Sequence, residues 1–172
     1  MQQNITRGPL NGEGSTFAIV VSRWNDFLTS KLADGAVDGL TSHGVSEAAV
    51  DIFHVPGAFE LPLAAQKLAE TGKYDAIIAL GVVIRGETPH FDYVASEAAR
   101  GITNVGLKTG IPVMFGVITA NTSEQAVSRS GVKDGNKGYE AAVSAIEMVS
   151  LFQGISGDAE EGKDEKALTH VV

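Results

Sequence analysis

The chain has 172 residues, of which 44% are hydrophobic, and its formal net charge at pH 7 is −8. This hydrophobic content excludes a disordered chain, and the acidic balance argues against general affinity for nucleic acid or anionic membranes. Because the chain has no cysteine, disulfides, cysteine nucleophiles and cysteine-ligated zinc or iron–sulfur clusters are excluded.

The two ends of the chain differ from its middle. Residues 1–15 are polar and rich in Gly, Asn and Gln, so we expect an N-terminal arm without the hydrophobic core of a secretion signal. Residues 153–172 hold five acidic residues and two lysines between Asp158 and Lys166, which predicts an acidic, flexible tail. A short docking segment, "ALTHVV", is an alternative for its last part. No apolar run approaches the roughly 20 residues of a membrane span, and a cytoplasmic protein is expected.

The middle, residues 16–152, alternates apolar runs with helical patterns in one domain. Strands are expected at 16–21, 49–55, 75–84 and 110–120. Helices are expected after each, beginning near residues 25, 62, 91 and 122, and the fourth is interrupted by "GVKDGNKG" before resuming over 139–152. This β-α order predicts an α/β fold, a three-layer αβα sandwich around a four-stranded parallel, flavodoxin-like sheet.

Unusual residues follow the expected strands, where ligands bind in sheets of this type. They are Trp24 and Asn25 after the first strand, Gly57 to Glu60 after the second, Arg85 to His90 after the third, and Phe115, Thr119 and Asn121 on and after the fourth. We therefore expect one rim that gathers aromatic and polar side chains.

For each of these residues, a purely structural role is an open alternative to ligand binding. Trp24 could equally staple the first helix, and Glu60 could favour the positive end of the second. Phe59 and Phe115 are more typical of core positions. His90 could be a hydrogen-bonded loop residue, although the ordinary histidine pKa of about 6.5 suits proton transfer.

The stretch "RGETPH" (85–90) has the features of an anion site. Gly86 lets the backbone approach a ligand, amides at a helix start favour an anion, and Thr88 adds a hydroxyl. Glu87 would repel phosphate unless it points away. Arg129 is a second candidate anion ligand, with a plain surface arginine as the equal alternative. "GNKG" (135–138) lacks the P-loop spacing, and the four histidines show no metal-binding spacing.

Five segments in order make the chain similar to the 6,7-dimethyl-8-ribityllumazine synthase family of riboflavin biosynthesis. They are "SRWND", "VPGAFELP", "ALGVVIRGETPHFDYV", "GVITANTSEQAVSRSG" and "GNKGYEAAVSAIEM". The resemblance implies a transferase that condenses 5-amino-6-(D-ribitylamino)uracil with 3,4-dihydroxy-2-butanone 4-phosphate, releases phosphate and water, and uses no cofactor.

The same resemblance implies a role for each site residue. Trp24 would stack on the pyrimidine, whose edge is read by backbone groups of Val82, Val83 and Ile84. The ribityl chain would be held by Asn25, Ala58 and Glu60, with Phe59 shaping the wall. The phosphate set would be Arg85, Gly86, Glu87, Thr88 and, from a neighbouring subunit, Arg129. Phe115 would also come from the neighbour, His90 would shuttle protons, and Lys137 and Glu140 would lie near the neighbour's contribution.

The resemblance further implies a homo-oligomer, either a pentamer or a 60-subunit icosahedral shell, with riboflavin synthase as a possible partner. The short connector "SGVKDGNKG" favours the shell. Two rival functions stay open, a flavin-binding electron carrier and a catalytically inactive shell-forming scaffold. The first rival lacks the Ser/Thr-rich phosphate loop that such carriers have after their first strand.

Overall fold

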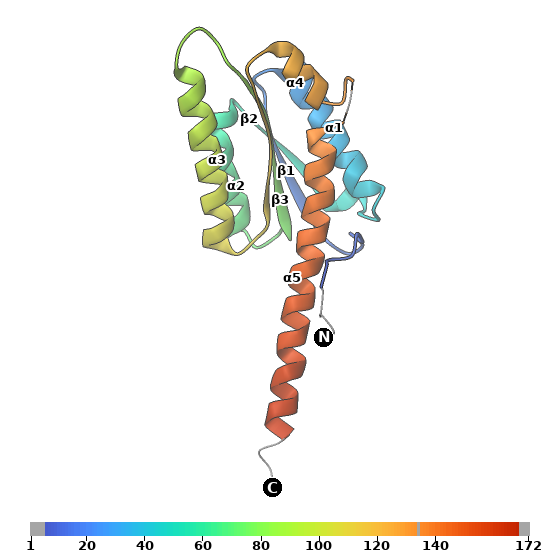
Figure 1. The fold of residues 1–172 in the computed structure, drawn as a ribbon. Helices are drawn as coiled ribbons and strands as arrows, with labels where there is room; N and C mark the ends of the chain where they lie inside the picture. Colours follow the sequence, from blue (N-terminus) through green and yellow to red (C-terminus); the bar gives the residue numbers. More distant parts are fainter. Residues whose placement is uncertain (1–5, 134, 169–172) are drawn as a thin grey trace, which may run out of the picture.

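A parallel sheet of four strands forms the centre of the molecule (Figure 1). The computed structural model describes the backbone of residues 6–133 and 135–168, and side chains of these ranges up to residue 157. The strand order is β2-β1-β3-β4. The strands are β1 (Phe17–Ser22), β2 (Val50–Val55), β3 (Ala76–Ile84) and β4 (Val113–Ala120).

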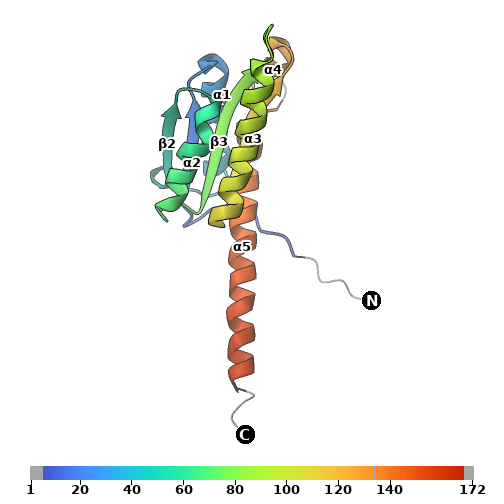
Figure 2. The same cartoon turned by 90° about the vertical axis from the view of Figure 1, so that its left-hand side faces the viewer.

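Helices cover both faces of this sheet, which confirms the expected three-layer α/β fold (Figures 1 and 2). One face carries α2 (Leu61–Glu70) and α3 (His90–Thr109), and the other carries α1 (Asp26–Thr41), α4 (Ser123–Arg129) and α5 (Lys137–Leu168). Two one-turn 3₁₀ helices, η1 (Glu47–Ala49) and η2 (Ala58–Glu60), flank β2. Within the described residues, no helix is both long enough and apolar enough to cross a membrane.

Alternation along the central strands divides the core into two clusters. Phe17, Ile19 and Val21 of β1 pack with α1 and α5, whereas Ala18 and Val20 pack with α2 and α3. All six residues of β1 are buried, as are the first eight of β3. A strand that is covered on both faces needs apolar side chains at every position, which explains the continuous apolar runs in the sequence.

Glycines allow the helices to approach each other closely. A Cβ placed on Gly138 of α5 would lie 2.0 Å from the carbonyl oxygen of Leu32 in α1. On the other face, a Cβ on Gly101 of α3 would lie 2.6 Å from Cβ of Pro62 in α2. The backbone of α5 therefore packs against the backbone of α1, and the backbone of α3 packs against the Pro62 ring of α2; a larger residue at either glycine would separate the helices.

The last helix differs from the prediction. The sequence pattern ends it at Phe152, but α5 continues to Leu168 and extends beyond the sheet (Figure 1, red). Nine of the sixteen added residues are Ala, Leu, Glu, Lys or Gln, which are strong helix formers, so a run of charge did not indicate an irregular backbone. The end of the "ALTHVV" segment lies outside the described residues.

The N-terminal segment contacts the same helix. Gly8 and Gly12 are buried, and a Cβ on Gly8 would lie 2.0 Å from the carbonyl oxygen of Glu147. Ser150 Oγ donates to the carbonyl oxygen of Asn11 at 3.4 Å. The described part of the predicted arm, residues 6–15, thus packs partly against α5, and the predicted arm boundary stays a prediction.

Candidate functional site

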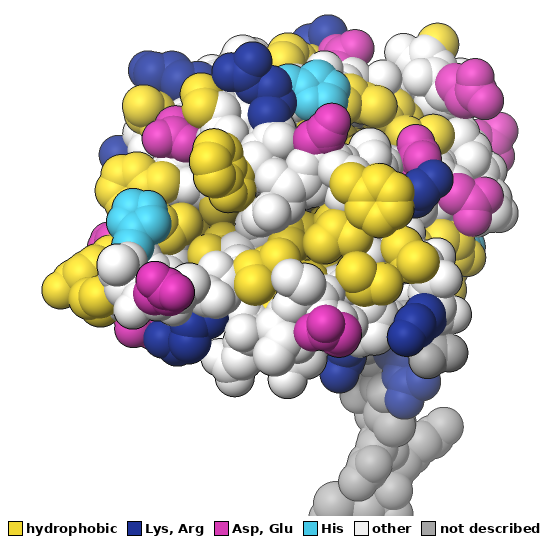
Figure 3. Space-filling model, turned by 90° about the horizontal axis from the view of Figure 1, so that it is seen from above, with side chains coloured by type: hydrophobic (Ala, Val, Ile, Leu, Met, Phe, Trp, Pro, Cys, Tyr) yellow, Lys and Arg dark blue, Asp and Glu magenta, His cyan; other side chains and the backbone are white. Residues whose placement is uncertain are grey.

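The carboxyl ends of the parallel strands all lie at one end of the molecule, the upper end in Figure 1. The loops that follow the strands form a rim there. Seen from above, exposed hydrophobic side chains lie among histidine, cationic and acidic side chains (Figure 3). The rim therefore offers stacking surfaces, proton donors and charges close together.

The loop after β1 lies beside the end of β2 and is hydrogen-bonded to it. The amide of Arg23 donates to Val55 O at 2.8 Å, and the amide of Trp24 donates to Pro56 O at 3.2 Å. The Trp24 side chain is 73% exposed. Little of the indole is packed against α1, so the staple interpretation of Trp24 is not supported in this chain.

Asn25 connects the first loop to the third strand. It is the N-cap of α1, as expected, in the left-handed region at φ 62° and ψ 44°, where asparagine is tolerated better than most residues. Its Nδ2 does not bond within the helix but donates to Val82 O at 2.9 Å. Val82, whose backbone groups are predicted to read a pyrimidine edge, therefore already accepts one hydrogen bond at its carbonyl oxygen.

The segment after β2 forms a turn of mixed exposure. Ala58 is buried, whereas Phe59 is 56% exposed, so the core interpretation of Phe59 is wrong for the single chain. Glu60 is exposed at the N-cap of α2, and its amide donates to Gly57 O at 3.3 Å. This turn presents a ring and a carboxylate next to the Trp24 loop.

The connection from β3 to α3 is short and exposed. Gly86, Glu87 and Thr88 are all exposed, and a Cβ on Gly86 would meet no atom within 4 Å. His90 is the first residue of α3 and is also exposed. Within the described residues, none of the side chains of Glu87, Thr88 and His90 makes a hydrogen bond or ion pair. The connection leaves backbone and side-chain groups available to a ligand.

Arg85 has partners that the sequence did not reveal. Its Nη2 and Nη1 donate to the two carboxylate oxygens of Asp92 at 2.8 and 3.2 Å, and its Nε donates to Asn121 Oδ1 at 3.0 Å. The guanidinium also lies 4.3 Å from the ring centroid of Phe91. The hydrogen bond from Arg85 lowers the pKa of Asp92, and the same bond raises the pKa of Arg85. The predicted phosphate contact of Arg85 competes with this pair.

Phe115 and Arg129 lie on opposite faces of the sheet, near β4. Phe115 pairs with Ala79, five residues before the end of β4, and is 39% exposed, so it is neither a rim nor a core residue of the single chain. It lies on the sheet face covered by α3, since its alternate neighbour Val117 packs there. Arg129 is exposed at the end of α4, on the other face. Both side chains lie at the β4 edge of the sheet.

The start of α5 holds the last two candidates. Lys137 and Glu140 form an ion pair of 3.1 Å. Asn136, which the sequence reasoning missed, caps the helix: its Oδ1 accepts from the amides of Gly138 at 2.8 Å and Tyr139 at 3.2 Å. Its Nδ2 donates to Lys31 O at 2.8 Å. An asparagine directly before a helical pattern was the available signal.

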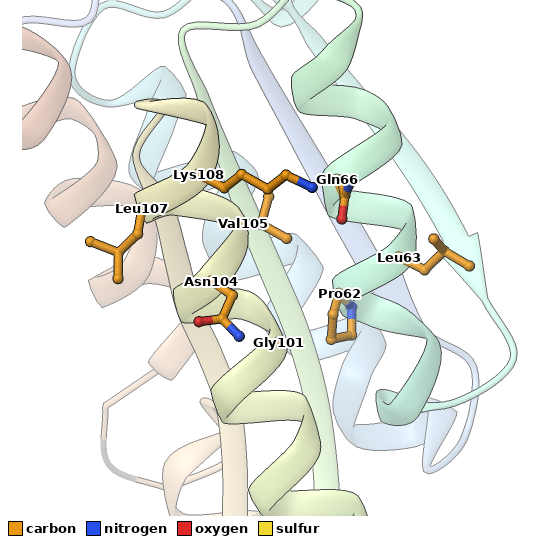
Figure 4. A pocket seen from close by; sticks show the side chains of 8 residues that line it. All are labelled: Pro62, Leu63, Gln66, Gly101, Asn104, Val105, Leu107 and Lys108. Carbon is orange, nitrogen blue, oxygen red and sulfur yellow. The ribbon is translucent and has the colours of Figure 1, made fainter.

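Two hollows on the described surface lie away from the rim. One, of about 690 Å³, lies between α2 and α3 (Figure 4), and the other, of about 540 Å³, lies beside α5 near Asp75 and Phe152. The candidate residues of the rim belong to neither hollow. Within the described residues, no group of three or more His, Asp or Glu side chains is arranged to hold a metal ion.

The fold defines an α/β protein whose candidate residues gather in exposed loops at the carboxyl ends of its strands. Comparison with known protein families identifies the family to which the chain belongs. A family model described as 6,7-dimethyl-8-ribityllumazine synthase matches residues 14–153, which is most of the chain. The chain belongs to this family, and the predicted membership is confirmed.

Proposed function

We propose that this protein is a transferase that condenses 5-amino-6-(D-ribitylamino)uracil with 3,4-dihydroxy-2-butanone 4-phosphate to give 6,7-dimethyl-8-ribityllumazine. The family match over residues 14–153 carries the proposal, because it includes every segment that forms the rim. The exposed and mostly unpaired groups of that rim are of the kinds that this reaction needs.

The pyrimidine substrate binds between the loops after β1, β2 and β3. The exposed indole of Trp24 stacks on the ring, and the backbone of Val83 and Ile84 reads its edge alongside Val82. Asn25 keeps its Oδ1 for the ribityl hydroxyls, because only Nδ2 is used on Val82 O. Ala58, Phe59 and Glu60 form the opposite wall.

The phosphate binds at the start of α3. The amides of Gly86, Glu87 and Thr88 precede the helix, where the backbone dipoles favour an anion, and the Thr88 hydroxyl adds a donor. Only the amide of Glu87 takes part, and its exposed carboxylate faces solvent. Arg85 makes no direct contact in this proposal, because its charge is already balanced by Asp92.

The chemistry then needs proton transfers at one place. The uracil amine attacks the ketone and water is lost, which gives an imine. Phosphate leaves by elimination to form an enol, which tautomerises to a ketone, and ring closure with loss of a second water gives the product. His90, exposed beside the phosphate loop, moves these protons, which is worth about 10²–10⁴-fold for a positioned side chain. Holding the two substrates together contributes up to roughly 7–11 kcal/mol.

The active unit is an oligomer in this proposal. Phe115 lies five residues before the end of β4, and Arg129 is exposed at the end of α4 on the other face; in this proposal both complete the site of a neighbouring copy. Leu63 and Leu107, which line the hollow between α2 and α3, are 66% and 81% exposed (Figure 4). An assembly would remove these side chains from water, which is worth roughly 1.5–3 kcal/mol for each leucine.

Light scattering measures the size of the assembly. We expect a pentamer or a shell of sixty copies, and we favour the shell because the connector 130–138 is short. A particle of pentamer size at every pH and phosphate concentration tested would reject the shell, and a monomer would reject the shared site.

The function is tested by mixing the purified protein with the two substrates and following lumazine fluorescence. We expect product only when both substrates and the protein are present, with one phosphate released per lumazine. Absence of product, with the fold intact by circular dichroism, would favour the scaffold rival. Protein that carries redox-active FMN would favour the electron carrier.

A further inference from the structure

The side chain of Arg85 crosses over the loop of residues 86–89, which joins β3 to α3. Its backbone is the last rung between β3 and β4, since its amide donates to Ala120 O at 2.9 Å. Its side chain reaches forward over residues 86–89 to Asp92, in the first turn of α3. Both ends of the four-residue loop are therefore joined by one bidentate ion pair.

The contacts of Arg85 extend this connection to the next strand and helix. Nε donates to Asn121 Oδ1 at 3.0 Å, directly after β4. The amide of Asn121 in turn donates to Gln125 Oε1 at 2.8 Å, and the amide of Gln125 donates to Thr122 Oγ1 at 3.3 Å. One guanidinium thus ties the end of β3 to the starts of both α3 and α4.

The loop itself has little to hold it. Residues 86–89 are exposed, and within the described chain the side chains of Glu87 and Thr88 make no hydrogen bonds. The orientation of its amides, and of His90 beside them, must therefore come from its two ends. A planar fork with two short contacts fixes orientation better than a single point charge does.

We propose that Arg85 and Asp92 are positioning residues that hold the 86–89 loop in its ligand-binding conformation and touch neither substrate. The effect on turnover rests on the proposed function, whereas the effect on the loop does not. If Arg85 instead bound the phosphate directly, the substitution Asp92→Asn would free its guanidinium and lower KM for the phosphate-bearing substrate.

The experiment uses the full chain with the substitutions Asp92→Asn, Arg85→Lys, Arg85→Gln and the double variant R85Q/D92N. Glu97→Gln is the matched control, because Glu97 is a similarly exposed acid on the same helix with its own ion pair, at 3.8 Å to Arg100. Each variant is measured for kcat, for KM of each substrate, and for the NMR backbone order parameters of Gly86, Glu87, Thr88 and His90.

We expect D92N and R85K each to lower kcat/KM for the phosphate-bearing substrate roughly tenfold, the order of losing one charge-assisted bidentate contact. KM for the uracil should change less than twofold, and the backbone order parameters of the loop should fall. E97Q should match the wild type. Because the two residues act as a unit, R85Q/D92N should lose no more than R85Q alone.

Several results would overturn the proposal. A lower KM for the phosphate substrate in D92N would mean that a freed Arg85 binds phosphate. Losses that multiply in the double variant would mean independent roles, and equal losses in E97Q would mean a general effect of helix charge. If D92N does not fold, R85K decides, and a change below twofold in its kinetics together with unchanged loop order parameters rejects the pair. If the wild type makes no lumazine, the proposed function fails, and the loop order parameters alone still judge the pair.

Discussion

Gly138 is the point where one added methyl group should have the largest structural effect. A Cβ there would lie 2.0 Å from Leu32 O, 2.7 Å from Leu32 C and 3.0 Å from Leu32 Cα. Contacts under 3.0 Å are essentially never seen for real Cβ atoms, so α1 and α5 would have to separate by at least 1.0 Å. The obstacle is backbone, which cannot rotate away as a side chain can.

The change in the free energy of unfolding caused by Gly138→Ala has two opposing contributions. Overpacking of this kind costs about 1–3 kcal/mol, and the upper end applies because Leu32 and Ala142, which the separation would loosen, are fully buried. Replacing glycine by alanine in a helix returns about 1 kcal/mol. We expect Gly138→Ala to lower the free energy of unfolding by about 2 kcal/mol.

Gly154→Ala is the control on the same helix. A Cβ on Gly154 would meet no atom within 4 Å, so only the helix propensity changes and stability should rise by up to about 1 kcal/mol. Urea unfolding is followed by far-UV circular dichroism at fixed protomer concentration, since Trp24 is too exposed to be a good fluorescent reporter. A G138A variant as stable as the wild type would refute the close crossing of α1 and α5.

Three further predictions concern the site and the opposite end of the sheet. His90→Ala should slow turnover about a hundredfold or more without abolishing it, and no detectable product at saturating substrates would contradict this. Arg129→Ala should raise KM for the phosphate-bearing substrate roughly tenfold or more and leave KM for the uracil nearly unchanged, whereas equal effects would count against a phosphate contact. The hydrogen bonds from Lys73 and Tyr74 lower the pKa of Asp51, so its contribution to stability is present at neutral pH and is lost as the pH falls through that lowered value. Asp51→Asn should therefore lower Tm at pH 7, and the difference from the wild type should shrink below about pH 4; a constant difference would disprove the linkage.

Local patterns in the sequence were enough to predict the sheet and most of its helices. The apolar runs of β1 and β3 follow from burial on both faces. Thr122 and Ser123 were both candidate caps for α4, and Thr122 is the cap. Such features depend on neighbours in the chain, so the sequence displays them directly.

Features that depend on long-range geometry were missed. Asp92 was not singled out in the sequence, because its pairing with Arg85 needs the loop between them to fold back. The bond from Asn25 to Val82 O joins residues 57 positions apart, so no local pattern signals it. Phe115 was assigned to the correct strand, but its distance from the rim depends on where β4 starts.

The direction of α5 separates two ends of the molecule. The helix begins beside the rim at Lys137 and runs to Leu168, past the end of the sheet that is opposite the rim (Figures 1 and 2). Its length is roughly 48 Å at 1.5 Å per residue. A fluorophore or peptide epitope attached near Gly157 would thus be displayed at the pole opposite the loops. The helix is a natural handle for labelling or immobilising the protein while its chemistry is left undisturbed.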